Sequence, residues 1–132
     1  MRSALRKDKF GEVFTPQILV QEMLDQLPSD SWVDPSKTFL DNSCGHGNFL
    51  VEILRRKLQF NHPVITALTT IFGLDIQQDN VDECKARLLE LVDETHRSEA
   101  KKIIDHNIVC HDAFTWDYEN WKSTEVKVKA LF

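Results

Sequence analysis

The stretch DNSCGHGNFL at residues 41–50 decides the fold, because it joins a strand to a helix through a loop that contains two glycines. Apolar residues in Thr38–Asp41 predict the strand, and apolar residues recur at helical spacing after the loop. Gly45 and Gly47 allow the chain to turn sharply and to approach a ligand closely. The start of the helix adds unpaired N–H groups and positive potential. The stretch therefore predicts a ligand-binding loop.

Two alternatives for this loop are less favoured. The dinucleotide-binding fingerprint requires Gly or Ala where this chain has Leu50, because a small residue lets the helix pack closely there. Leu50 therefore disfavours a dehydrogenase. A glycine turn without any ligand is the second alternative, and the acidic residues that follow later strands disfavour it.

Strands and helices alternate along the rest of the chain. Strands are predicted at Thr38–Asp41, at Ile71–Leu74 and at Ile108–Cys110, and a fourth is expected in the tail Glu125–Phe132. Helices are predicted from Thr15 to Pro28, after Gly47, from Val64 to Thr70, from Asn80 to Val92 and from about Ser98 to Asp105. In the first helix the apolar residues at helical spacing are Ile18, Leu19, Met23 and Leu27. This alternation is typical of a parallel sheet covered by helices.

An acidic residue stands at or just after the end of each of the first three predicted strands. These residues are Asp41, Asp75 and Asp112. Because right-handed crossovers bring the carboxyl ends of parallel strands to one edge of the sheet, the three carboxylates are expected to meet there. This arrangement predicts a single ligand crevice.

Four motifs in this order resemble the adenine-N6 DNA methyltransferases that use S-adenosylmethionine. The glycine loop is similar to motif I of that family, and Gly11–Pro16 (GEVFTP) is similar to the Phe-Thr-Pro segment that precedes it. Phe72–Ile76 (FGLDI) resembles motif II, and His111–Phe114 (HDAF) resembles motif III. The resemblance implies a truncated class I methyltransferase (Rossmann-like) α/β fold. We expect about four mainly parallel strands with flanking helices, in a single domain over residues 1–132.

The resemblance also implies roles for individual residues in binding S-adenosyl-L-methionine. Phe14, Thr15 and the glycine loop are expected to hold the methionine end, with Asp41 facing its ammonium group. Asp75 is expected to accept hydrogen bonds from both ribose hydroxyls, and Ile76 to lie against the adenine face. Asp112 is expected to accept from the adenine amine, with Phe114 beside the ring. The full expected set is Phe14, Thr15, Pro16, Asp41, Gly45, Gly47, Phe49, Asp75, Ile76, Asp112, Ala113 and Phe114.

No catalytic residue is assigned, because the family's Asn/Asp-Pro-Pro-Tyr/Phe tetrapeptide does not occur in this sequence. The isolated chain is therefore expected to be inactive and to need a C-terminal part or a partner for methyl transfer to adenine in DNA. The alternative is a non-catalytic module that binds S-adenosylmethionine, either a decayed or a regulatory relative. An edge strand at Val126–Phe132 would pair with a second copy or with a complementing subunit.

Composition and residue spacing narrow the classes of protein and of site that remain. The net charge of −5 argues against direct DNA binding by this chain, so contact with DNA is expected through another chain or domain. No apolar run approaches the roughly 20 residues of a membrane span, and a soluble cytoplasmic protein is expected. The three cysteines and five histidines lack the spacing of a metal site. Trp116, Tyr118 and Trp121 either stack on bases or pack against the sheet.

Overall fold

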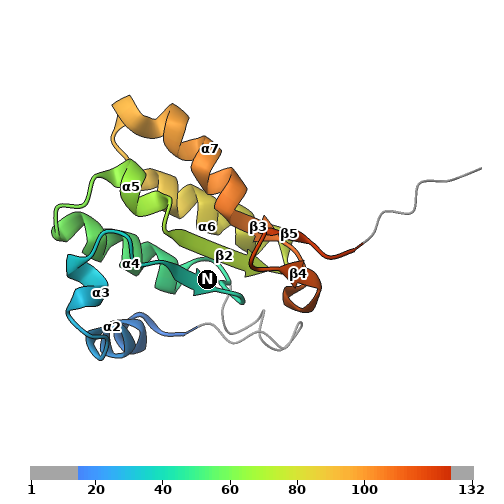
Figure 1. Ribbon diagram of the computed structural model, residues 1–132, viewed down its shortest axis with the longest axis horizontal. Helices are drawn as coiled ribbons and strands as arrows, with labels where there is room; N and C mark the ends of the chain where they lie inside the picture. The colour runs from blue at the N-terminus through green and yellow to red at the C-terminus, as the bar shows by residue number, and fades with distance from the viewer. Residues whose placement is uncertain (1–14, 126–132) are drawn as a thin grey trace, which may run out of the picture.

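The computed structural model describes residues 15–125, which form a three-stranded parallel sheet with flanking helices and a separate two-stranded antiparallel hairpin (Figure 1). The elements follow the chain in the order α2 (Gln17–Asp25), α3 (Asp30–Val33), β1 (Phe39–Asp41), α4 (Asn48–Gln59), α5 (Val64–Leu68), β2 (Ile71–Asp75), α6 (Gln78–Glu90), the 3₁₀ turn η1 (Glu94–His96), α7 (Arg97–Asn107), β3 (Ile108–Cys110), the 3₁₀ turn η2 (Ala113–Thr115), β4 (Trp116–Asp117) and β5 (Lys122–Ser123). The expected α/β class and parallel sheet are confirmed. Within residues 15–125, every helix is too short or too polar to traverse a bilayer.

The sheet has the order β1-β2-β3, and both pairs of neighbouring strands are parallel. Asp41 pairs with Gly73, and Asp75 pairs with Cys110, so the carboxyl ends of the three strands lie at one edge. The expected fourth strand is not part of this sheet as described. It falls on residues 126–132, which lie outside the described part of the chain, and so does the edge association predicted for them.

Helices α4 and α6 cover one face of the sheet and pack against each other. Their apolar positions recur every three or four residues, so each helix turns one buried stripe toward β2. The buried side chains from these elements include Leu50, Ile53, Leu54, Val81, Cys84, Leu88 and Ile71. Gly73 of β2 makes this close packing possible, because a Cβ at that position would lie 2.6 Å from Leu50 Cδ1.

Helix α2 is shorter than expected, and the apolar residues noted at helical spacing are not the ones that it buries. It ends at Asp25, and its buried residues are Val20 and Leu24, whereas Ile18 and Met23 are exposed. Contacts with α4 set this orientation, since Arg56 forms an ion pair with Asp25. The apolar spacing predicted the helix but not the face that packs.

Helix α3 and the β4–β5 hairpin were not predicted, and aromatic packing accounts for both. Helix α3 interrupts a polar stretch because buried Trp32 stacks on Phe39 of β1, with ring centroids 5.3 Å apart. The β4–β5 hairpin lies next to β3 (Figure 1). Its Trp121 packs edge-on against Phe72 of β2, with centroids 4.9 Å apart, and its Nε1 donates to His106 O. This geometry favours packing against the sheet over base stacking for the aromatic strip.

The packing at Gly73 generates the first prediction. Gly73→Ala should lower the free energy of unfolding by about 1–3 kcal/mol, because the added methyl group overlaps Leu50 and α4 must shift. Chemical denaturation followed by circular dichroism measures the effect. Leu50→Val removes the nearest overlapping atom, so the double variant should be less destabilised than the sum of the two single variants. Additive effects would show that α4 does not pack on Gly73.

Candidate functional site

Asp75 organises the edge of the sheet where the strands end. Its side chain is 8% exposed, and its two oxygens accept hydrogen bonds from three groups. Oδ2 accepts from the Gly45 amide at 2.9 Å, and Oδ1 accepts from the Gln77 amide at 2.8 Å and from Asn80 Nδ2 at 3.3 Å. A buried carboxylate needs such donors to offset its lost hydration. Asp75 therefore connects the glycine loop, the end of β2 and the start of α6.

The glycine loop takes a conformation that favours glycine at both positions. Gly45 has φ 53° and Gly47 has φ 98°, both in the left-handed region. The Cys44 amide donates to Leu74 O at 2.8 Å, which fixes the loop above the end of β2. A Cβ on Gly47 would lie 2.8 Å from Cys84 Sγ of α6. Gly47 thus allows α6 to approach the loop, while the Gly45 amide is directed at Asp75.

A cleft of about 260 Å³ opens beside this loop. Its lining residues are Thr15, Asp41, Ser43, Cys44, Gly45, His46, Asn48 and Phe49. The structure thereby brings together four of the expected site residues, namely Thr15, Asp41, Gly45 and Phe49. Pro16 precedes α2 next to Thr15 and is exposed. Phe14 lies outside the described residues.

The surroundings of Asp41 in this cleft disfavour the ionised form of its carboxyl group. Burial raises the pKa of Asp41 above its usual 3.8, and the nearby Asp75 carboxylate raises it further. The Ser43 amide donates to Asp41 Oδ1 at 3.1 Å and acts in the opposite direction, toward a lower pKa. A cationic group placed in the cleft would relieve this cost, because an opposite charge favours the ionised carboxylate.

The remaining expected residues lie at the same edge but do not line this cleft. Ile76 is 68% exposed and Phe114 is 96% exposed, so both present apolar surface to solvent. Asp112 lies outside β3 and caps the η2 turn, with its Oδ1 accepting from the Phe114 amide at 2.9 Å. Ala113 is fixed within that turn because its carbonyl accepts from the Tyr118 hydroxyl at 2.7 Å.

The cleft also contains residues for which the sequence predicted no role. Ser43, His46 and Asn48 line it, and all three belong to the motif I stretch. Their position within the motif I stretch was the only feature of the sequence that could have indicated a role for them. The side-chain partners of His46 and Asn48 come from distant parts of the chain, which motif spacing does not reveal.

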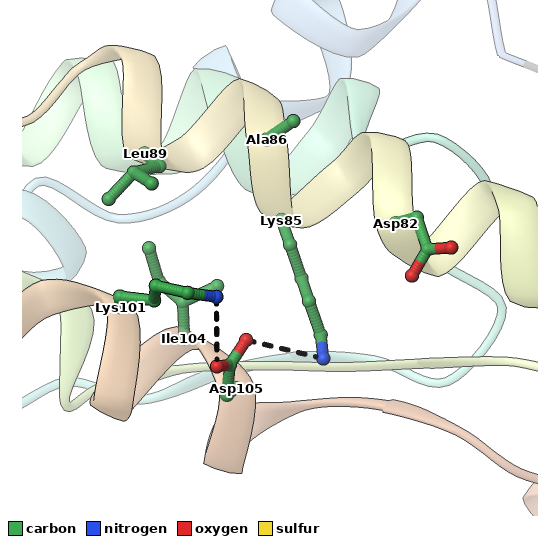
Figure 2. Close-up of a pocket in the computed structure, with 7 residues that line it drawn as sticks. All are labelled: Asp82, Lys85, Ala86, Leu89, Lys101, Ile104 and Asp105. Carbon is green, nitrogen blue, oxygen red and sulfur yellow. Dashed lines mark hydrogen bonds and ion pairs between the residues drawn. The ribbon is translucent and has the colours of Figure 1, made fainter.

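A larger cleft of about 430 Å³ lies between α6 and α7 (Figure 2). Leu89 and Ile104 provide its apolar surface, and Lys85 and Lys101 both extend toward Asp105 (Figure 2). Asp105 forms ion pairs with Lys85 at 3.4 Å and with Lys101 at 3.2 Å. Lys85 thus pairs with Asp105 across the two helices, whereas Lys101 pairs with Asp105 within α7, and we interpret this cleft as a helix–helix contact.

The raised pKa of Asp41 generates a prediction about stability and pH. Because the folded-state pKa exceeds the unfolded one, the ionised Asp41 carboxylate destabilises the fold at neutral pH, and this cost disappears as pH falls below the unfolded-state pKa. Asp41→Asn keeps the acceptor for the Ser43 amide. The variant should be more stable than the parent at pH 7, and thermal midpoints should converge as pH falls toward about 4.

Asp117→Asn is the matched control for Asp41→Asn. The side-chain hydrogen bond from Asn120 lowers the pKa of Asp117, which is the opposite direction. No gain in stability is therefore expected from this control at pH 7. If the Asp41→Asn variant were less stable than the parent at pH 7, this would contradict the interpretation that the ionised Asp41 carboxylate destabilises the fold.

The close approach of α6 to Gly47 generates a third prediction. Gly47→Ala should cost about 1–3 kcal/mol of unfolding free energy, from the left-handed backbone and from the overlap with Cys84. Asn61→Ala is the control, because Asn61 is exposed and has φ 65°. Urea titration should show a smaller loss for Asn61→Ala. Equal losses would mean that α6 does not restrict the loop.

Comparison with known proteins relates the chain to methyltransferases. The sequence is 33% identical over 85 residues to the type II methyltransferase M.VspI of Vibrio sp. (strain 343). The match covers 64% of this chain and 18% of that protein, so the chain spans less than a fifth of the relative that it matches. The sequence matches no protein-family model. The similarity supports a relationship to methyltransferases, in agreement with the α/β fold.

Proposed function

We propose that this chain forms the S-adenosylmethionine-binding part of an adenine-N6 DNA methyltransferase. One observation carries the proposal. The carboxylates of Asp41 and Asp75 stand at the ends of adjacent parallel strands, on either side of a glycine loop whose Gly45 amide is held by Asp75. The similarity to a type II methyltransferase supports the same assignment. The order of the four motifs is the basis for adenine as the target.

The cleft beside the glycine loop suits the methionine end of this cofactor. Asp41 is a partly buried carboxylate whose pKa is raised by desolvation, and the ammonium group is a cation that would stabilise its ionised form. Thr15 and Phe49 would form the walls of this part of the site.

Asp75 suits the ribose, with one adjustment to the expectation. A carboxylate offers about four acceptor sites, and three of those on Asp75 are already used within the protein. One ribose hydroxyl can therefore donate to Oδ2 without displacing a protein group. A second hydroxyl would replace the Asn80 donor, whose 3.3 Å contact is the longest of the three.

The adenine moiety would lie farther along the same edge. Ile76 and Phe114 expose apolar side chains there, and burying them against an aromatic ring would be favourable. Asp112 still has an acceptor for an exocyclic amine after its hydrogen bond with the Phe114 amide.

The bound cofactor would supply an electrophilic methyl group, whereas the residues described here bind and orient. None of them is proposed to hold the target amine. A net charge of −5 gives little attraction for phosphates, so we assign contact with DNA to another chain or domain.

Calorimetry with the full chain tests the proposed function. S-adenosylmethionine and S-adenosylhomocysteine should bind with dissociation constants between micromolar and millimolar. Asp75→Asn should weaken binding by on the order of 1.5–3 kcal/mol, the range for hydrogen bonds to a charged group. Asp105→Asn makes the same chemical change in the α6–α7 cleft and should bind like the parent.

Two outcomes would contradict this assignment. Absence of heat with either ligand at millimolar concentration would overturn the proposed cofactor. Equal affinity of Asp75→Asn and the parent would overturn the ribose role of Asp75 while leaving the cofactor itself in place. The thermal midpoint of Asp75→Asn is measured alongside, because loss of the acceptor for Gly45 also lowers stability.

A further inference from the structure

Asn48 connects two segments that are far apart in the sequence. It is the first residue of α4, and its Nδ2 donates to the carbonyl of Thr15 at 2.8 Å. Its Oδ1 accepts from Nη1 of Arg87 on α6 at 2.9 Å. Both Asn48 and Thr15 line the cleft beside the glycine loop. One amide thus joins the segment before α2, the start of α4 and the last turn of α6.

Arg87 fixes the orientation of this amide. The same Nη1 donates to His46 O at 2.9 Å and lies 3.0 Å from His46 Nδ1, so the guanidinium is held against the glycine loop. A guanidinium has donors only, so it can face only the oxygen of the Asn48 amide. The NH₂ group must therefore point toward the Thr15 carbonyl, which is an acceptor only. The chemistry of the two partners excludes the flipped amide.

This orientation determines where Thr15 lies relative to the loop. The carbonyl of Thr15 would otherwise be free to turn to water, and the segment before α2 would be free to move away from the loop. With the hydrogen bond in place, Thr15 stays on the same cleft as Asp41 and Phe49.

We propose that Asn48 is a positioning residue for the cofactor, which holds Thr15 in the wall of the cleft while Arg87 holds Asn48. The inference rests on the proposed function, since the cleft is the one assigned to the methionine end. Asn48 acts through Thr15 and is not itself a catalytic residue.

The variant Asn48→Asp separates this role from a purely structural one. The carboxylate has the same shape as the amide and still accepts from Arg87, with added charge attraction. A negative charge in the first turn of α4 also favours the helix. However, a carboxylate cannot donate to the Thr15 carbonyl and repels it. The stronger pair with Arg87 neutralises the added charge and offsets the lost contact with Thr15, so stability should be kept or raised, while affinity for the cofactor falls.

Calorimetry and thermal unfolding of the full chain give the test. For Asn48→Asp we expect an affinity for S-adenosylmethionine and S-adenosylhomocysteine that is about three- to tenfold lower, the range of one hydrogen bond. The thermal midpoint should be unchanged or higher. Asn48→Ala removes both contacts without adding charge and should lose affinity and stability together. Asn120→Asp is the matched control, because Asn120 Nδ2 donates to Asp117 on the exposed hairpin, away from the cleft.

Each remaining outcome has a distinct meaning. Affinities equal to the parent in both Asn48 variants would overturn this inference and leave the proposed function standing. Reduced affinity in Asn48→Ala alone, with normal binding by Asn48→Asp, would also overturn it, because the donor to Thr15 would then be unnecessary. A parent protein that binds neither ligand would overturn the proposed function and this inference with it.

Discussion

The hydrogen bond from the Gly45 amide to the buried Asp75 carboxylate is the constraint on which the site depends. A charged hydrogen bond of this kind stabilises by about 1.5–3 kcal/mol, and an unpaired carboxylate at this depth would be costly. The bond therefore fixes the glycine loop relative to the central strand. Two further donors, the Gln77 amide and Asn80, extend the same constraint to the start of α6.

The end of β2 holds its neighbours through backbone contacts as well. The Leu74 carbonyl accepts from Cys44, and the Asp75 carbonyl accepts from His111. Three strand ends are thus tied to one point, and the side chains there are placed before any ligand arrives. The arrangement has an electrostatic cost, because the Asp41 carboxylate is partly buried near the Asp75 carboxylate. A site that is less stable when empty is a common feature of binding sites, since the ligand supplies the missing charge.

Much of the fold was predictable from local signals. The glycine loop, the three strands and the helices α4 and α6 follow from turn chemistry and apolar spacing, which act within a few residues. The residues that α2 buries, Val20 and Leu24, were not among those noted at helical spacing, because contacts with α4 rather than spacing decide which face packs. The hairpin was missed for a similar reason. It depends on Trp121 packing against Phe72, a contact between distant segments.

In the candidate site, too, local signals predicted some of the residues and missed others. Asp41, Gly45 and Asp75 were identified because each stands at a strand end or in the loop. Asn48 was not identified, because its partners lie 33 and 39 residues away in the sequence. Side-chain bridges of this length have no periodic signature. The hydrogen bond between the Gly45 amide and Asp75 was also not predicted, since the sequence indicated a ligand role for both residues and no contact between them.

Amide chemical-shift mapping with S-adenosylhomocysteine tests whether the edge organised by Asp75 is the cofactor site. The full chain is titrated, and backbone resonances are followed residue by residue. The largest changes are expected at Ser43, Gly45 and Ile76, with little change at Lys85, Lys101 and Asp105 in the α6–α7 cleft. Unchanged resonances at Gly45 with millimolar ligand, or the largest changes in the α6–α7 cleft, would contradict this assignment of the cofactor site.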